Sequence, residues 1–469
     1  MVRSSDKECL KLYNILLELY AEIAEVADIN HNLAAIFFND LVQVLTSVLL
    51  SNTDLRTNHK LYFACFKPSV LQKLSIKQKI LNTMPFFFRN TKRVGFSGVS
   101  LHNSFFLAEL LKNKISPVFI DRGIISIDNF DEQFEKILLA IRYICDEFSF
   151  SVPSAKLEEY FKSVFVGYLA AKKNNKLEID LLITGTQQNT LSRVIAANAR
   201  SHKIPVVCIS HGDGDQLTTD EPRIGYGELT YATHFFGYGK WGETLLKKTE
   251  YAKSLGDNQP MYCAANSDTC YKIYKPEGRV KKLSEFDSPE YMYVPTKFVG
   301  EKQYGPFHVP SDQEYLKWQR LMLKMYPNVI YKRHPKNFAN YSEFEFKRCI
   351  TDNFAQCLDM ADVFIFDVIS TAFQIAAATD KPIIFFDIGI RNIHADVKKR
   401  IMKRCIWIEA LTCRDSHVLF SSVEKQANEQ KINEYTKDIC LDGSSNSRKT
   451  ALLSLIQKVL QKTINEEAL

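Results

Sequence analysis

Short apolar runs that alternate with helical patterns occur twice along this chain, and this alternation constrains the fold more than any other feature. In the first half, helical patterns separate runs at 92–98, 117–121, 179–184 and 204–210. In the second half, the arrangement repeats with runs at 291–296, 329–332, 362–367 and 382–387. Such runs are typical of strands in parallel sheets, joined by right-handed helical crossovers. The sequence therefore predicts an α/β fold with two Rossmann-type domains that face a cleft.

The length of 469 residues supports this organisation, because it exceeds what a single core normally holds. We expect a helical extension at 1–90, where strand alternation is absent. A first domain should follow at 91–285 and a second at 286–469. The stretch from 225 to about 290 is rich in Tyr, Gly, Asn and Pro, so we expect it to form a linker and the outer part of the first domain.

Composition and charge limit the kinds of binding partner that we expect for this protein. The formal charge of +6, with 24% charged residues, fits an anionic small molecule or a loose contact with a membrane surface, and argues against nucleic acid. The eleven cysteines are scattered without C-x-x-C spacing, which indicates reduced, mostly buried thiols. The first twenty residues carry several charges and do not resemble a signal peptide. We expect a cytoplasmic protein, with peripheral contact to the inner membrane as an option; the sequence does not predict an oligomeric state.

A cluster of cations follows the run at 329–332. Arg333, His334 and Lys336 are close together, and Pro335 ends the strand and restricts the loop. An arginine and a protonatable histidine suit a phosphate ester, since they neutralise the charge that develops on a leaving nucleotide. We expect Arg333, Pro335 and Lys336 to bind a donor and His334 to take part in catalysis. A solvated basic loop is the alternative.

Ser370 and Thr371 begin a helical pattern directly after the run at 362–367. Serine and threonine are favoured helix caps, and the start of a helix offers free N–H groups and a positive dipole to an anion. Simple capping accounts for one hydroxyl, whereas two adjacent hydroxyls in the same domain as a basic strand-end loop favour a phosphate. We therefore place Ser370, Thr371 and Asp367, from the same strand-to-helix turn, in the donor-binding set.

Another apolar run leads directly into His211-Gly212-Asp213-Gly214-Asp215. In doubly wound sheets, ligands bind at the carboxyl ends of strands, and the two glycines leave room for a substrate. A histidine or a carboxylate can serve as general base for an acceptor hydroxyl, so His211 and Asp213 are catalytic candidates and Asp215 is a third. Metal binding by His211 and Asp213 is less favoured, because no further histidine–carboxylate pair completes a ligand set. We expect neither a metal nor a cofactor.

Taken in order, these motifs resemble a group of bacterial transferases. The stretch 361–373, followed by 381–386, looks like the donor-domain signature of CDP-glycerol glycerophosphotransferases and of capsule or lipopolysaccharide Kdo-type transferases. Bacterial sialyltransferases and polysialyltransferases with the GT-B fold show an acidic-Gly motif, then His-Pro, then Ser-Ser/Thr. Here Asp213-Gly214, His334-Pro335 and Ser370-Thr371 follow the same order. The resemblance covers the later half of the first domain and most of the second.

The resemblance implies roles for these residues. His334 would bind or protonate the departing phosphate of a CMP or CDP donor, while Ser370 and Thr371 hold that phosphate. Asp213 would be the base on the sialyltransferase model. On the glycerophosphotransferase model, His211 of the His-Gly motif would be the base. The Gly-Asp-Gly-Asp arrangement departs from the two acids and a glycine of the sialyltransferases, so the identity of the base stays open.

We therefore predict an inverting glycosyltransferase that moves an acidic sugar (Kdo, sialic acid or a related nonulosonate) from a CMP-activated donor to an acceptor hydroxyl. The acceptor would be a glycan, glycolipid or protein in bacterial surface glycan synthesis, such as capsule or lipopolysaccharide. Val368-Ile369-Ser370-Thr371 stands where the glycerophosphotransferases usually have Tyr-Ser-Ser, which favours a sugar donor. The alternatives are a CDP-glycerol-type glycerophosphotransferase, a UDP-sugar 2-epimerase and a non-catalytic nucleotide-sugar-binding scaffold.

Overall fold

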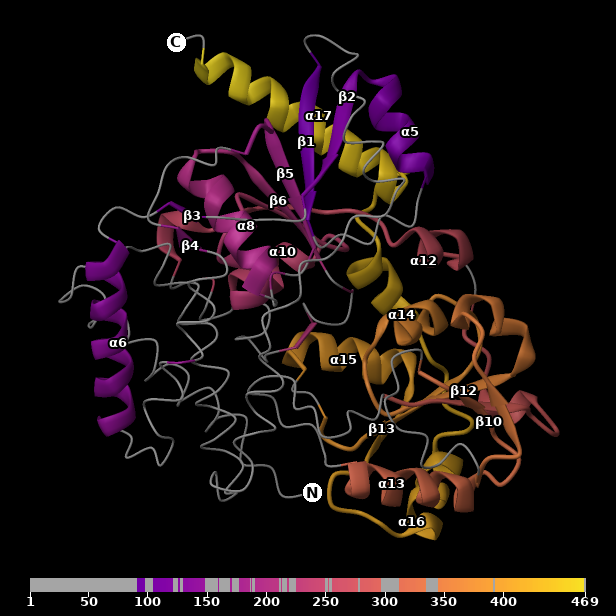
Figure 1. Ribbon diagram of the computed structural model, residues 1–469. Helices are drawn as coiled ribbons and strands as arrows, with labels where there is room; N and C mark the ends of the chain where they lie inside the picture. Colours follow the sequence, from indigo (N-terminus) through magenta and orange to yellow (C-terminus); the bar gives the residue numbers. More distant parts are fainter. Residues whose placement is uncertain are drawn as a thin grey trace.

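The computed structural model shows two lobes, each built around a parallel sheet of six strands (Figure 1). The structure describes residues 91–97, 104–120, 125–126, 130–147, 159, 169–170, 177–185, 187, 190–210, 212, 217–218, 225–248, 252, 255–276, 279–296, 312–334, 345–390 and 393–467. The helical extension expected at 1–90 lies outside the described residues.

The first sheet is parallel throughout and has the strand order β2-β1-β5-β6-β7-β8. Its strands are β1 (Lys92–Ser97), β2 (Ile115–Phe119), β5 (Leu181–Thr184), β6 (Val206–Ile209), β7 (His234–Phe236) and β8 (Met261–Cys263). The order reverses between β1 and β5, which is the switch point of a doubly wound sheet. Strand β5 is buried along its whole length, as expected where both faces of a parallel sheet are covered.

Helices and turns surround this sheet. They are α5 (Ser104–Lys112), α6 (Phe130–Glu147), α8 (Thr190–Ser201), α10 (Gly242–Lys247), the π-helical turn η3 (Gly225–Leu229) and the 3-10 turn η4 (Gly256–Asn258). Strands β3 (Ile125–Ser126) and β4 (Leu169–Ala170) form a separate parallel pair. Small and branched residues of α8, among them Val194, Ile195 and Ala199, are completely buried, so this helix is held by packing.

The four apolar runs predicted in the first half all form strands, and the two helical patterns form α5 and α8. One expectation was incomplete. The stretch from 225 to about 290 also supplies β7 and β8 to the sheet. These strands have three residues each, which is too short for hydrophobic periodicity to identify.

The second sheet is also parallel throughout, with the order β11-β10-β9-β12-β13-β14. Its strands are β9 (Tyr291–Val294), β10 (Ile330–Lys332), β11 (Arg348–Ile350), β12 (Val363–Phe366), β13 (Ile383–Asp387) and β14 (Ile406–Glu409). Counted along the lobe this order is 3-2-1-4-5-6, that of dinucleotide-binding doubly wound sheets. The switch point therefore lies between β9 and β12.

Both faces of the second sheet are covered. Side chains alternate along β12: Val363 and Ile365 join one core cluster, and Phe364 and Phe366 join another. Helices α13 (Asp312–Met325) and α16 (Ser416–Lys425) contribute to the first cluster, and α14 (Thr371–Ala377) and α15 (Ala395–Arg404) to the second. The remaining elements are α12 (Asp268–Ile273), η5 (Leu283–Glu285), η7 (Phe354–Gln356), η8 (Leu358–Met360), η9 (Thr436–Cys440) and α17 (Arg448–Glu467). The predicted α/β fold with two Rossmann-type sheets is confirmed.

Two described segments, 264–267 and 440–447, connect the lobes, and they bind each other. The Ser267 backbone N–H donates to the carbonyl of Cys440 at 2.9 Å. The Asn266 amide donates to the carbonyls of Ser444 (3.0 Å) and Asn446 (2.9 Å). The lobes are thus joined by a short, hydrogen-bonded pair of segments.

Helix α17 returns to the first lobe after the second crossing (Figure 1). Its residues Leu455, Ile456 and Val459 share a core with Val94 and Phe96 of β1. The predicted extent of the second domain, 286–469, would place this helix with the second sheet. It packs on the first instead, because its apolar face completes the core beneath β1.

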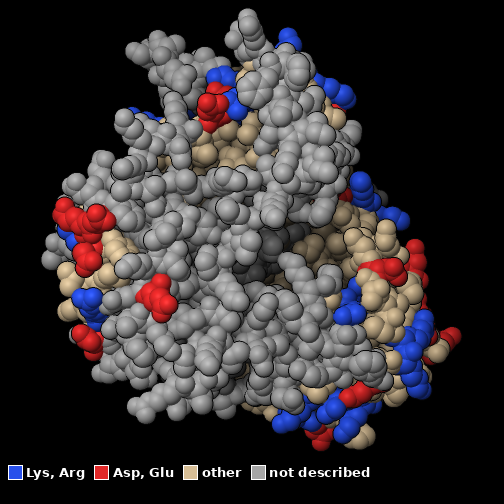
Figure 2. Space-filling view, viewed as in Figure 1, with Lys and Arg blue, Asp and Glu red and all other residues tan. Residues whose placement is uncertain are grey.

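The face seen in Figure 2 shows Lys and Arg next to Asp and Glu along the lower edge of the second lobe, near α13 and α16. Ion pairs such as Arg320–Glu345, with 2.8 Å between Nη2 and Oε1, join the two signs there. In the part of the chain that the structure describes, no helix is both long and apolar enough to span a bilayer.

Candidate functional site

The carboxyl edge of the second sheet brings together the ends of β9, β10 and β12. Tyr293 of β9 is in register with Tyr331 of β10 and with Ile365 of β12, so the three strands end at similar heights. Neighbouring strands are about 4.8 Å apart, which puts β10 and β12 about 10 Å apart on either side of β9. Residues that follow β12 therefore border the switch point, where doubly wound sheets bind ligands, and residues that follow β10 lie one strand away from it.

Arg333 and His334 directly follow β10. The Arg333 backbone N–H donates to the carbonyl of Ile350 at 2.9 Å, which extends the pairing with β11 by one residue. Both side chains are partly exposed at the edge of the sheet. The structure thus places these two predicted residues at the carboxyl edge, one strand away from the switch point. Pro335 and Lys336 lie outside the described residues.

Ser370 and Thr371 start α14, as predicted. Ser370 has an extended backbone and is the N-cap: its Oγ accepts from the Phe373 backbone N–H at 3.4 Å. Thr371 is the first helical residue, and its side chain is exposed. Helix capping therefore accounts for the hydroxyl of Ser370, although the hydrogen bond is long. The hydroxyl of Thr371 is not used for capping and is exposed at the carboxyl edge of the sheet.

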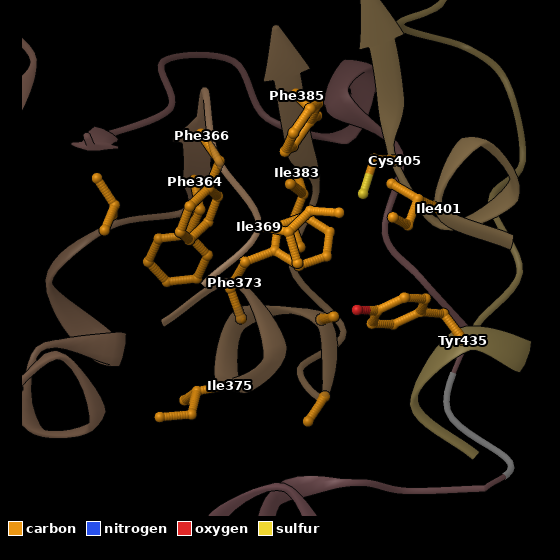
Figure 3. Packing of buried hydrophobic residues seen from close by; sticks show 14 of the residues in the cluster. Phe364, Phe366, Ile369, Phe373, Ile375, Ile383, Phe385, Ile401, Cys405 and Tyr435 are labelled. Carbon is orange, nitrogen blue, oxygen red and sulfur yellow. The ribbon is translucent and has the colours of Figure 1, made fainter. Parts of the chain in front are cut away.

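Apolar packing fixes the start of α14. Figure 3 shows Phe373 at the centre of an aromatic group. Its ring meets those of Phe366, Phe385 and Tyr435 edge-on, with centroid distances of 5.4, 5.6 and 5.6 Å. Burying a phenylalanine of this kind stabilises the fold by about 1.5–3 kcal/mol. The position of Ser370 and its neighbour is therefore set by the core and not by a flexible turn.

Asp367, expected to bind the donor, is enclosed by protein groups. It is 2% exposed, and its Oδ2 accepts from Tyr293 Oη, Tyr315 Oη (2.7 Å) and Trp318 Nε1 (3.2 Å). Its Oδ1 accepts from the backbone N–H of Thr296 at 3.1 Å. Burial raises the pKa of this carboxyl, and the donors act against that rise. Asp367 therefore links β9, β12 and α13 beneath the edge. Its described hydrogen bonds are all to these protein groups and not to the exposed site at Thr371.

Gly212, which follows β6, lies close to the second lobe. A Cβ atom built on Gly212 would lie 3.4 Å from Oγ1 of Thr371, so the backbone of Gly212 lies close to that side chain. Ser210 Oγ donates to the Gly212 carbonyl at 3.2 Å and holds the turn from below. The structure thus joins two motifs that are far apart in the sequence. The base candidates His211, Asp213 and Asp215 lie outside the described residues, although the first two adjoin Gly212 in the chain.

A second contact fixes the end of the same loop. The His394 backbone N–H donates to the carbonyl of Leu217 at 3.1 Å, and Thr218 forms an antiparallel bridge with Ile393. The side chain of His394 is largely buried, and burial lowers its pKa. Sequence reasoning missed this histidine, because nothing local marks it as the partner of a loop in the other lobe.

Carboxylates end the next two strands, Asp387 on β13 and Glu409 on β14, and Lys398 of α15 lies near both. Lys398 Nζ lies 2.7 Å from Oε1 of Glu409 and 3.4 Å from Oδ2 of Asp387, and the backbone N–H of Gly389 donates to Asp387 at 3.0 Å. Burial and the neighbouring Glu409 raise the pKa of Asp387. Sequence reasoning also missed this cluster, although Asp387 ends its apolar run just as Asp367 ends another.

Comparisons with known proteins show only a distant structural similarity. No protein-family model matches this sequence, and no curated protein is significantly similar to it. Among solved structures, MurG of Acinetobacter baumannii is 12% identical, with a TM-score of 0.40 over 78% of this chain and 100% of that one. The glycotransferase of kitacinnamycin is 10% identical, with a TM-score of 0.39 over 79% and 100%. LpCGTa, in complex with UDP, is 10% identical, with a TM-score of 0.33 over 79% and 99%. Superpositions at this level assign neither a family nor an activity, so a function has to follow from the chemistry of the site.

Proposed function

We propose that this protein is an inverting glycosyltransferase whose active site forms where Gly212 meets Thr371. Their proximity is the observation that carries the proposal, because a Cβ atom built on Gly212 of one lobe would lie 3.4 Å from Oγ1 of Thr371 at the helix start of the other. An acceptor group and a donor group would then approach from opposite lobes. Transfer between two bound substrates requires this kind of close positioning.

The donor half consists of Arg333, His334, Ser370 and Thr371. The cation and the imidazole would neutralise phosphate charge, and the hydroxyls and first N–H groups of α14 would hydrogen-bond to phosphate oxygens. Since β10 and β12 lie on either side of β9, these groups would approach a phosphate from two sides. The described groups supply this neutralisation without requiring a metal.

In the proposed reaction, an acceptor hydroxyl attacks the anomeric carbon of the donor sugar. Its proton passes to Asp213 or His211, and the new glycosidic C–O bond forms on the face opposite the leaving group. The bond between the anomeric carbon and the phosphate oxygen breaks, and CMP leaves with that electron pair, stabilised by Arg333 and His334. One displacement of this kind inverts the anomeric configuration.

The finer specificity rests on the motif resemblance. We propose a CMP-activated acidic sugar as donor and a surface glycan, glycolipid or protein as acceptor, with transfer in the cytoplasm or at the inner face of the membrane. A CDP-glycerol donor would use the same phosphate-binding groups, with attack at phosphorus in place of carbon. Product analysis with CMP-sugars and with CDP-glycerol separates these two reactions.

A thermal-shift screen against CMP, CDP, UDP and GDP tests the donor half. A nucleotide at a hundredfold excess over its dissociation constant should raise the free energy of unfolding by about 2.7 kcal/mol, which is readily detected. We expect the cytidine nucleotides to give the largest shift. A shift with UDP alone would overturn the CMP assignment, and no shift with any of the four would overturn the nucleotide site itself. Incubation with UDP-N-acetylglucosamine alone would reveal a 2-epimerase, and tight binding without turnover would indicate a scaffold.

A further inference from the structure

Lys332, the last residue of β10, is a lysine in the core. Its side chain is 5% exposed, and it lies on the same face of the strand as Ile330. That face packs against η7, where Phe354 and Cys357 are buried. Lysines are almost never buried to this extent unless they are paired, so the position calls for an explanation.

The ammonium group folds back onto the next peptide. Lys332 Nζ donates to the carbonyl oxygen of Arg333 at 2.9 Å. The N–H of Arg333 is itself held by Ile350 of β11. Because the peptide that joins Arg333 to His334 is planar, fixing its carbonyl oxygen also fixes the direction in which the chain continues to His334.

Among the described residues, the hydrogen-bond partner of Lys332 Nζ is a neutral carbonyl, and Asp352 is the carboxylate that favours its charge electrostatically. Burial lowers the pKa of Lys332, while Cys357, Asp352 and Cys349 act in the opposite direction. An ammonium group out of water and without an adjacent anion is unfavourable. A bound anion nearby would stabilise the charged ammonium group. Such an anion could bind at the adjacent carboxyl edge, where Arg333 and His334 lie.

We propose that Lys332 is a positioning residue for the donor site: it holds the Arg333–His334 peptide in place and adds positive charge behind the bound phosphate. This inference rests on the proposed function, since it assumes that a phosphate binds at this edge. Lys332 touches the backbone and not the reacting atoms, so it acts through the position of His334 and through its charge at a distance.

Lys381 provides a matched control in the same lobe. Its Nζ also donates to backbone carbonyls, those of Leu358 (2.7 Å) and Ala361 (2.6 Å). Lys381 precedes β13 and Ala361 precedes β12, so this lysine lies at the amino edge, opposite the candidate site. Replacing either lysine by methionine removes the charge and the hydrogen bonds while keeping the length of the side chain. Only Lys332→Met should affect the donor site.

The test measures the dissociation constant of CMP by calorimetry for the wild type, Lys332→Met, Lys332→Arg and Lys381→Met. A charge-assisted interaction of ordinary strength corresponds to about a tenfold change in affinity, so we expect Lys332→Met to weaken CMP binding about tenfold. Lys332→Arg should recover most of that loss, and Lys381→Met should bind CMP as the wild type does. In transfer assays, Lys332→Met should raise KM for the donor and leave KM for the acceptor unchanged.

Wild-type affinity in Lys332→Met, or an equal loss in Lys381→Met, would overturn the positioning role. Hydrogen exchange of the peptide covering 330–336 in the free protein separates this outcome from failure of the proposed function. If the wild type binds no nucleotide, the proposed function fails. Even then, faster hydrogen exchange of this peptide in Lys332→Met than in Lys381→Met would support the role of Lys332 in holding the Arg333–His334 peptide. Equal exchange rates in the two variants would overturn that role.

Discussion

The carboxyl edges of the two sheets are built differently. The edge of the second sheet is supported from below: Asp367 joins β9, β12 and α13, and Phe373 anchors α14 in an aromatic core. The edge of the first sheet carries a loop whose described residues, Gly212, Leu217 and Thr218, touch the opposite lobe. The described contacts of the second-sheet edge, which we call the rigid edge, come from its own lobe, and those of the first-sheet edge, which we call the dependent edge, come from the other lobe. This difference suggests that the donor half of the site is preformed and that the acceptor half depends on how the lobes meet.

Loss of His334 should produce the largest effect. Removing one group that stabilises charge in a transition state lowers the rate by about 10²–10³. We therefore expect His334→Ala to abolish measurable transfer while its thermal unfolding stays close to that of the wild type. Turnover by this variant near the wild-type rate would remove His334 from the mechanism and leave the rigid edge without a catalytic residue.

Asp367→Asn tests the support beneath the rigid edge. Asparagine cannot accept from all of the donors that surround this carboxylate, and leaving buried donors unsatisfied should cost about 3 kcal/mol of stability. Denaturant unfolding of the two proteins at pH 7 measures the difference. A loss of CMP binding without a loss of stability would instead mean that Asp367 contacts the donor directly.

The same variant also tests a predicted pH dependence of folding stability. Burial raises the pKa of Asp367, so between the unfolded and folded pKa values the folded state holds more protons than the unfolded state. The stability of the wild type should therefore fall as pH rises through that window. Asp367→Asn lacks this proton, and the stability difference between the two proteins should shrink over the same rise in pH.

Gly212→Val tests the dependent edge. A Cβ at this position already lies 3.4 Å from Oγ1 of Thr371, and the branches of valine would have to enter that space. We expect kcat/KM to fall about tenfold, which corresponds to about 1.4 kcal/mol, while CMP binding is largely retained. Thr371→Ala in the same protein should recover part of this loss if the two residues are coupled. Independent, additive effects in the double-mutant cycle would show that the lobes do not meet here in solution.

Lys248→Ala should have the smallest effect. Lys248 Nζ lies 3.0 Å from Oδ2 of Asp396 in α15, and both side chains are about half exposed. Exposed ion pairs contribute about 0.2–1 kcal/mol, and salt weakens them. We expect a small decrease in thermal stability at low salt that disappears at high salt. A larger decrease would mean that the contact between the lobes relies on charge more than on the backbone contacts of Leu217 and Thr218.

Sequence patterns predicted most of the fold, because buried parallel strands leave long apolar runs. In the two six-stranded sheets they missed β7, β8, β11 and β14, and the reason is clearest for β11, an edge strand whose residues Arg348 and Cys349 are exposed. The positions of Arg333, His334, Ser370 and Thr371 at one edge also followed from strand ends alone. Two features did not follow. The sequence shows an acid at 367 but not that protein donors surround it, and it gives no sign that Gly212 contacts Thr371.

The return of α17 to the first lobe also determines the order in which this protein can fold during synthesis. The second sheet is complete once residue 409 has been made, whereas the core under β1 needs residues 452–460. A ribosome therefore releases all the strands of the second lobe before the first lobe can bury its own apolar surface. Until that last helix emerges, the lobe made first keeps an open hydrophobic face, and a chaperone that shields such faces would be expected to bind there.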